Sequence, residues 1–148
     1  MISKSKIVQL LQNELQRKRD ILSDEEHLLQ DSLEDQTKSS VGDKYETTRA
    51  MLHIELDKLK IQNRIYVEQK RALDQIRSGI NERIVFGSVV HTSIGLFLIG
   101  PSIGKFKSPG LDIMCISVKA PLSKAMWHKR KGDELIFNQR KIEIISVY

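Results

Sequence analysis

The chain has 148 residues, of which 40% are hydrophobic and 29% charged, a composition typical of a folded protein rather than a disordered one. Its one cysteine, Cys115, excludes an internal disulfide and cannot alone form a thiolate zinc site, so a reducing compartment suits it. No stretch approaches the ~18 apolar residues of a membrane helix, and the N-terminus lacks the apolar run of a signal peptide. We therefore expect a cytoplasmic protein with no membrane partner.

Charge is divided unevenly along the chain. Residues 1–81 carry 14 basic and 14 acidic side chains, whereas residues 82–148 carry 10 basic and 5 acidic ones. The whole net charge of +5 therefore belongs to the C-terminal part. Residues 20–35 hold seven acids and no Lys or Arg. A basic part joined to an acidic one is a dipolar layout that can orient docking to a partner.

Apolar residues recur every seven positions in two segments of the N-terminal half. The first series is Val8, Leu15, Leu22 and Leu29, and the second is Tyr45, Leu52, Leu59, Tyr66, Leu73 and Ile80. A seven-residue apolar repeat is the seam of a left-handed coiled coil. The pattern predicts helices over about 4–36 and 43–78, and the short connection between them predicts antiparallel packing.

Two carboxylates, Asp43 and Glu46, lie three residues apart where the second helix is expected to begin. A D-x-x-E pattern at a helix start is a capping box, in which both side chains bond to backbone amides. The same pair could instead share a divalent cation, because Mg²⁺ is commonly held by one or two protein carboxylates together with phosphates and water. Spacing favours capping but leaves both interpretations open.

The C-terminal half changes pattern and predicts a small, mostly antiparallel sheet with one short helix. Strands are expected over 83–92 and 94–100, joined by a turn near Ser93, and again over 112–118. Residues 101–110 read as a loop, residues 120–128 as a short helix, and residues 134–137 and 141–148 as a final hairpin. The chain is therefore expected to be an α+β protein with domains at 1–80 and 81–148.

A group of basic residues in the C-terminal half could bind phosphates or an acidic protein surface. The group consists of Lys124, Lys129, Arg130 and Lys131, together with Lys105 and Lys107. A solubilising turn explains the run at 129–131 equally well. No base-stacking aromatics are interleaved with these residues, which argues against a module that reads nucleic-acid sequence.

Four stretches carry a resemblance to a known family. They are GDKYE at 42–46, RIVFGSVV at 83–90, ISVKAPLSKAMWHKRKGDEL at 116–135 and the final IEIISVY. The first is similar to a G-D-x-x-E tip motif, and the third to the signature I-S-x-x-S-P-[LI]-[GA]-x-A-L-x-G-K-x-x-G-D. Across nearly its whole length the chain resembles the Gre factors, the bacterial transcript-cleavage factors.

The resemblance implies a transcription elongation factor whose partner is RNA polymerase. It implies an FKBP-like C-terminal domain at the rim of the polymerase secondary channel and a coiled coil that passes down the channel. Asp43 and Glu46 would then help to hold a Mg²⁺ ion shared with the polymerase and orient water against the backtracked nascent RNA. The factor would have no cofactor of its own and would not be an enzyme alone.

The chain departs from the family pattern at three places. Thr47, Thr48, Arg49 and Ala50 replace the usual N-A-E-Y, Tyr45 places an aromatic ring between the two acids, and His128 stands where the family usually has Gly. Two alternatives remain: a channel-binding regulator without cleavage activity, and a peptidyl-prolyl isomerase, since FKBP-like folds can have that activity. We expect a monomer, although the heptads also allow self-association.

Overall fold

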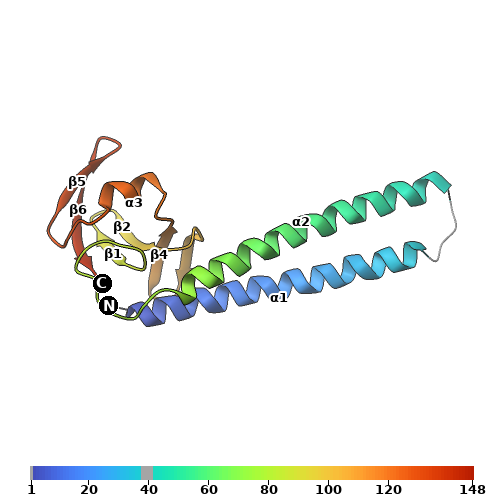
Figure 1. Ribbon diagram of the computed structural model, residues 1–148, viewed down its shortest axis with the longest axis horizontal. Helices are drawn as coiled ribbons and strands as arrows, with labels where there is room; N and C mark the ends of the chain where they lie inside the picture. Colours follow the sequence, from blue (N-terminus) through green and yellow to red (C-terminus); the bar gives the residue numbers. More distant parts are fainter. Residues whose placement is uncertain (1, 38–41) are drawn as a thin grey trace. The chain divides into compact units, whose positions relative to one another are not determined.

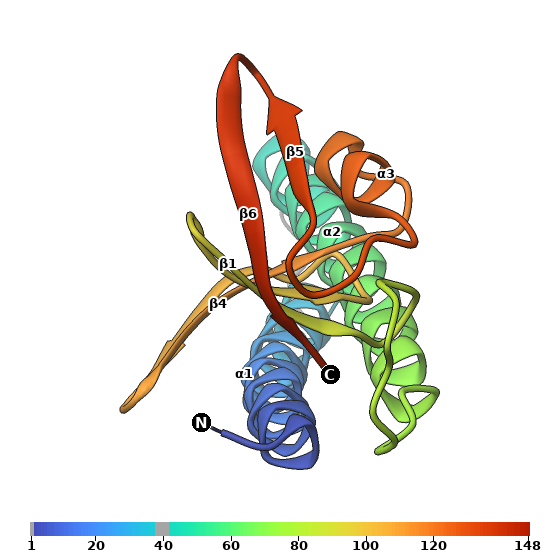
Figure 2. The same ribbon diagram turned by 90° about the vertical axis from the view of Figure 1, so that its left-hand side faces the viewer.

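The computed structural model describes residues 2–37 and 42–148, and the side chains of residues 36, 37 and 42–45 lie outside this description. Helix α1 spans Lys4–Thr37 and helix α2 spans Gly42–Asp74, so both predicted helices are confirmed. Figures 1 and 2 show them running in opposite directions. Within the described part of the chain, neither helix has an apolar run that could cross a membrane.

The structure separates into two compact units, which we call the helical unit and the sheet unit. The helical unit comprises Asn13–Glu68, and the sheet unit comprises Met1–Gln12 and Gln69–Tyr148. In the helical unit Leu15, Leu22 and Leu56 are buried, and the Lys18 ammonium lies 5.9 Å from the centre of the Tyr66 ring. Division of the chain into domains at residues 80 and 81 stays a prediction.

The predicted end of the second helix at residue 78 is wrong, because α2 ends at Asp74. The amides of Gln75 and Ile76 donate to the carbonyls of Ala72 and Leu73 at 3.2 and 3.1 Å. These bonds span three residues rather than four, which tightens and closes the last turn of a helix. Ile80, expected in the helical seam, is 82% exposed.

The sheet unit contains six strands and one short helix. The elements are β1 (Val89–Thr92), β2 (Gly95–Ile99), β3 (Gly104–Ser108), β4 (Leu111–Ile116), α3 (Pro121–Met126), β5 (Glu134–Phe137) and β6 (Arg140–Val147). The strand order is β3-β4-β2-β1-β6-β5, and every neighbouring pair is antiparallel except β2 and β4. The predicted α+β class, with two long helices followed by a mostly antiparallel sheet, is confirmed.

The loop predicted over residues 101–110 is wrong between residues 104 and 108, where β3 forms. Gly104 to Ser108 pair with β4 along their whole length, from Gly104 opposite Cys115 to Ser108 opposite Leu111. Gly104, the first residue of β3, has a φ of 84°. Glycine adopts this backbone conformation readily, whereas residues with a Cβ atom do not. The glycine that suggested a loop is therefore the residue that turns the chain into the strand.

A buried apolar cluster holds the sheet unit together. It contains Ile84, Val90, Phe97, Ile99, Met126, Leu135, Ile142 and Ile144. Burial of side chains of this size stabilises a fold by about 1.5–3 kcal/mol each before entropy is counted. The cluster joins β1, β2, β5 and β6 to α3, and so fixes the turn between α3 and β5 that carries most of the predicted basic group.

Candidate functional site

The D-x-x-E motif lies at the start of α2. The helix begins at Gly42, so Asp43 and Glu46 both occupy helical positions. Residues three apart on a helix are neighbours on its surface. The side chains of Asp43 and Tyr45 lie outside the described residues, whereas Glu46 is exposed and, among the described residues, has no hydrogen-bond or ionic partner.

Asp43 and Glu46 are two carboxylates, the number that a Mg²⁺ site commonly takes from a protein when phosphates and water supply the other ligands. Bound through one oxygen each, they would supply two of the roughly six oxygens around the ion. Within the part of the chain that the structure describes, no group of three or more His, Cys, Asp or Glu side chains could hold a metal ion. Any Mg²⁺ held by Asp43 and Glu46 would need further ligands besides these two carboxylates.

The acidic stretch of α1 presents most of its charge to solvent. Six of its seven carboxylates are exposed and Glu26 is half-buried; the exposed ones are Asp20, Asp24, Glu25, Asp31, Glu34 and Asp35. This stretch and the start of α2 lie in the same helical unit. An acidic surface on that unit matches a positively charged partner surface.

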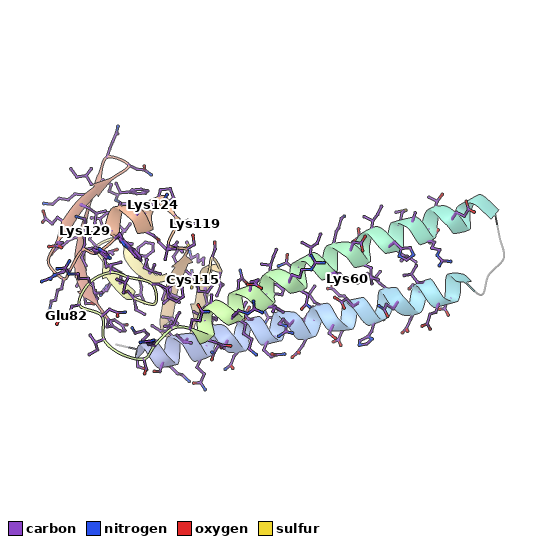
Figure 3. All side chains as sticks on the ribbon, in the orientation of Figure 1. Lys60, Glu82, Cys115, Lys119, Lys124 and Lys129 are labelled. Atoms are coloured by element: carbon purple, nitrogen blue, oxygen red, sulfur yellow. The ribbon has the colours of Figure 1, made fainter. Side chains whose placement is uncertain are left out.

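The four basic residues around α3 come from neighbouring positions of the sheet unit. Figure 3 labels Lys124 on α3 and Lys129 beyond its end. Lys124, Arg130 and Lys131 are exposed, and Lys129 is half-buried. The turn that carries Lys129, Arg130 and Lys131 is held in part by a side chain, since the Arg130 amide donates to Asp133 Oδ2 at 2.8 Å.

Lys105 and Lys107 lie on a different part of the sheet unit from the four basic residues around α3. Both lie on β3, at the opposite edge of the sheet from β5. The Lys107 ammonium also lies 3.8 Å from Asp112 Oδ2, so an acid accompanies it. The basic surface that the structure supports is therefore the smaller one around α3 and the turn after it.

The sequence did not indicate a cavity in the sheet unit that is lined by Lys4 and Ser146, among other residues. Lys4 is 4% exposed although it lies in the first turn of a helix, where a lysine is ordinarily solvated. No motif marks either residue. Only the fold brings the start of α1 beside the end of β6, where the Tyr148 hydroxyl donates to the Ile2 carbonyl at 3.0 Å.

The chain is thus an α+β protein with an acidic helical unit and a basic sheet unit. Comparison with protein-family models and with curated proteins finds no match. Among solved structures, the chain is similar to the GreA factor homolog 1 (Gfh1) protein of Thermus thermophilus, at 18% identity over 93% of this chain and 94% of that one, with a TM-score of 0.36.

Two further structures give similar values. One is described as the transcription factor Gfh1, at 20% identity over 93% of this chain and 92% of that one, with a TM-score of 0.36. The other is Thermus aquaticus Gfh1, at 17% identity over 92% of each chain and a TM-score of 0.32.

Proposed function

We propose that the chain is a Gre-like transcription elongation factor that binds RNA polymerase through its secondary channel and stimulates cleavage of backtracked RNA. The observation that carries the proposal is the position of the D-x-x-E motif. It opens α2 at the connection between two long antiparallel helices, with Glu46 exposed. A pair of carboxylates at this position could enter a narrow channel of a partner ahead of the rest of the helical unit.

The length of the helices supplies the reach that this function requires. Within the helical unit, α1 continues from Asn13 to Thr37. At about 1.5 Å per residue, this portion extends roughly 37 Å. Two helices packed through one seam have the cross-section of a rod, so the motif can be carried into a partner while the remainder of the factor stays outside.

The proposed chemistry uses a metal ion held jointly with the polymerase. In a two-metal site, the ions stabilise the attacking and leaving oxygens of an in-line displacement at phosphorus. Asp43 and Glu46 would complete the coordination of one Mg²⁺ and orient water toward the backtracked nascent RNA. In this proposal the factor supplies two carboxylates at a defined position, and the polymerase supplies the remaining metal ligands. The factor therefore does not need a complete active centre of its own.

The signature resemblance supports a docking role for the sheet unit. Residues 116–135 cover the end of β4, α3 and the start of β5. Within this stretch the buried Ser123 hydroxyl donates to the Ser117 carbonyl at 2.6 Å, which fixes the start of α3. We propose that Lys124, Lys129, Arg130 and Lys131 bind the polymerase surface, with Tyr45 contacting it beside the two acids.

One observation favours a second candidate function, a channel-binding regulator without cleavage activity. Residues 47–50 (TTRA) are exposed directly after Glu46 and include a positive charge where the related motif carries an acid. A cation beside the acids competes with a metal ion for their negative charge. Such a factor would enter the channel without assisting hydrolysis.

Incubation with a stalled, backtracked polymerase complex tests the proposal. The wild-type factor and Mg²⁺ should shorten RNA labelled at its 5′ end. Asp43→Asn combined with Glu46→Gln should slow cleavage by about 100-fold or more, because the reacting groups lose their positioning. Asp57→Asn with Glu55→Gln is the matched control, since it removes the same charge from exposed positions of α2 outside the acidic stretch of α1 and should leave cleavage unchanged.

Two further outcomes distinguish the alternatives. Binding to the polymerase without cleavage selects the regulator; replacing TTRA by NAEY at residues 47–50 should then create cleavage. Cleavage that survives loss of both tip acids contradicts their role. Turnover of a proline peptide in the absence of polymerase would instead identify an isomerase.

A further inference from the structure

A cavity of about 480 Å³ lies within the sheet unit where four segments meet. The segments are the start of α1, the linker after α2, the turn before β5 and the end of β6. Pockets of about 300–1,000 Å³ are the usual size for small-molecule sites. The polar residues that line it are Ser3, Lys4, Ser78, Lys131, Ser146 and Tyr148.

The charged side chains of the cavity are both cations. Lys4 and Lys131 line it, and no Asp or Glu is among the lining residues. Lys4 is 4% exposed and, among the described residues, makes no hydrogen bond or ion pair. Burial lowers the pKa of its ammonium. The covered part of Lys4 is therefore its stem, because its ammonium nitrogen is not among the solvent-shielded atoms without a partner, and the ammonium can face an anion in the cavity.

A buried hydroxyl also lacks a partner. Ser146 Oγ is shielded from solvent and makes no hydrogen bond within the part of the chain that the structure describes. Ser3 Oγ accepts a hydrogen bond of 3.2 Å from the Lys6 amide, which leaves its own hydrogen available to donate. The Tyr148 hydroxyl already donates to the Ile2 carbonyl and so closes one wall. Two hydroxyl donors and two ammonium groups therefore share one cavity.

The start of α1 adds to the positive potential. This 34-residue helix has no acidic residue in its first turn. The positive end of its dipole therefore acts on the cavity without compensation. The positive potential of the helix dipole adds to the effect of the Lys4 ammonium and the Ser146 hydroxyl, neither of which has a partner among the described residues. Without these two side chains, the helix start alone would not indicate a binding site.

We propose that this cavity binds a small phosphorylated organic molecule, with Lys4 and Lys131 as counter-charges and Ser146 as a hydrogen-bond donor. Phosphate suits the donor set because it accepts bonds in several directions from ammonium and hydroxyl groups. Ile2, Ile80 and Val147 form apolar walls for the organic part. The site is formed entirely by the sheet unit and does not depend on the proposed binding to RNA polymerase.

Calorimetric titration of the full chain with inorganic pyrophosphate and with a nucleoside 5′-diphosphate tests the site. Both should bind, and the diphosphate should bind more tightly because it also covers the apolar walls. Lys4→Met keeps the length of the buried stem and should weaken binding by about 10- to 100-fold. Lys131→Met, at an exposed position, should weaken it by about two- to fivefold. Lys119→Met is the matched control, since Lys119 is exposed and lies outside the cavity, and it should bind as wild type does.

Thermal unfolding separates ligand binding from folding. Without ligand, Lys4→Met should unfold at a temperature no lower than wild type, because Met keeps the covered apolar stem and removes a partly desolvated ammonium. It should also lose the rise in unfolding temperature that pyrophosphate gives to wild type. A general loss of structure cannot produce that combination. If Lys4→Met fails to fold, Lys131→Met and Ser146→Ala decide, and both should bind more weakly than wild type.

Three results would overturn the proposal. One is a wild-type chain whose unfolding temperature responds to pyrophosphate no more than to sodium chloride of equal ionic strength. Another is undiminished binding by both lysine variants. The third is citrate binding as tightly as pyrophosphate, which would show that the cavity accepts any small multivalent anion.

Discussion

The backbone amide of His128 donates a hydrogen bond of 2.9 Å to the carbonyl oxygen of Ile84. The Ile84 amide in turn donates to the Lys129 carbonyl at 2.9 Å. Ile84 is fully buried in the apolar cluster, so these two bonds attach the residues after α3 to the core. The basic turn at 129–131 is therefore a fixed surface feature whose direction is set by the core, which is what a docking surface requires.

The conformation of His128 makes its substitutions predictable. His128 has a φ of 62°, in the left-handed region that only Gly, Asn and Asp adopt readily. A β-branched side chain is most disfavoured there. We expect His128→Val to lower the free energy of unfolding by about 1–2 kcal/mol more than His128→Asn. Urea denaturation of both variants measures the difference.

The control for that comparison is a histidine in a strand. His91 is exposed on β1, and its φ is not positive. Because strands favour β-branched residues and disfavour Asn, the order should reverse, with His91→Val at least as stable as His91→Asn. Equal effects of Val at both positions would show that backbone strain at His128 does not contribute.

The two long helices could be predicted because their pattern is local. An apolar residue every seventh position, without Pro or internal Gly, specifies an amphipathic helix whatever the rest of the chain does. The end of α2 could not be predicted in the same way. Ile80 continues the seven-residue series, but the chain has already left the helix at Asp74. Periodicity does not report where tertiary contacts stop supporting the next turn.

The strand β3 shows the opposite difficulty. Its Lys105-Phe106-Lys107 run alternates between exposed and half-buried side chains, which is a strand signal. The Gly, Pro and Ser residues on both sides of this run favoured a loop, and the sequence prediction followed them. The position of the tip motif was accessible to sequence reasoning because it depends on one helix start. The cavity was not, since Lys4, Lys131 and Ser146 are far apart in sequence and meet only through the topology of the sheet unit.

The seam of the helical unit can be tested by a pair of alanine substitutions on α2. Leu56 is 6% exposed, whereas Ile61 is 56% exposed. Leu56→Ala should lower the free energy of unfolding by about 2–4 kcal/mol, because it leaves a cavity between the helices. Ile61→Ala should change it by less than about 0.5 kcal/mol. Circular dichroism during thermal unfolding, at several protein concentrations, measures both.

The concentration series also tests self-association. If a second copy covers Ile61, Ile61→Ala should be destabilising, and the wild-type unfolding temperature should rise with protein concentration. We expect neither, which corresponds to a monomer in which only the Leu56 side of α2 is covered.

The Ser123 hydroxyl provides a test of how the start of α3 is held. Ser123 is fully buried and donates to the Ser117 carbonyl at 2.6 Å. Ser123→Ala should lower the free energy of unfolding by about 1 kcal/mol, because this carbonyl also accepts a bond from the Ala120 amide and is not left unsatisfied. Ser102→Ala, at an exposed side chain, should have no measurable effect. A loss above about 3 kcal/mol would mean that the hydroxyl also prevents a rearrangement of the turn.

Cys115 should be chemically inert while the protein is folded. Its side chain is 1% exposed on β4, and burial raises the pKa of the thiol to about 12 from the ordinary 9.0. At about pH 8 the reactive thiolate should therefore be roughly 1,000-fold scarcer than in the unfolded chain, and access is blocked as well. Alkylation by iodoacetamide, followed by mass spectrometry, should label the chain only when urea unfolds it.

The same thiol makes stability depend on pH in a defined direction. Because the folded pKa lies above the unfolded one, the native state retains a proton that the unfolded state loses between about pH 9 and 12. Stability should be unaffected by this group below pH 9 and should then fall by roughly 1.4 kcal/mol per pH unit. Cys115→Val removes this dependence. Burial also lowers the pKa of the Lys4 ammonium and raises the pKa of the Tyr148 hydroxyl, but both groups are present in wild type and in Cys115→Val, so the difference between the two proteins isolates the thiol. An identical slope in the two would show that Cys115 is not buried from solvent in the folded protein.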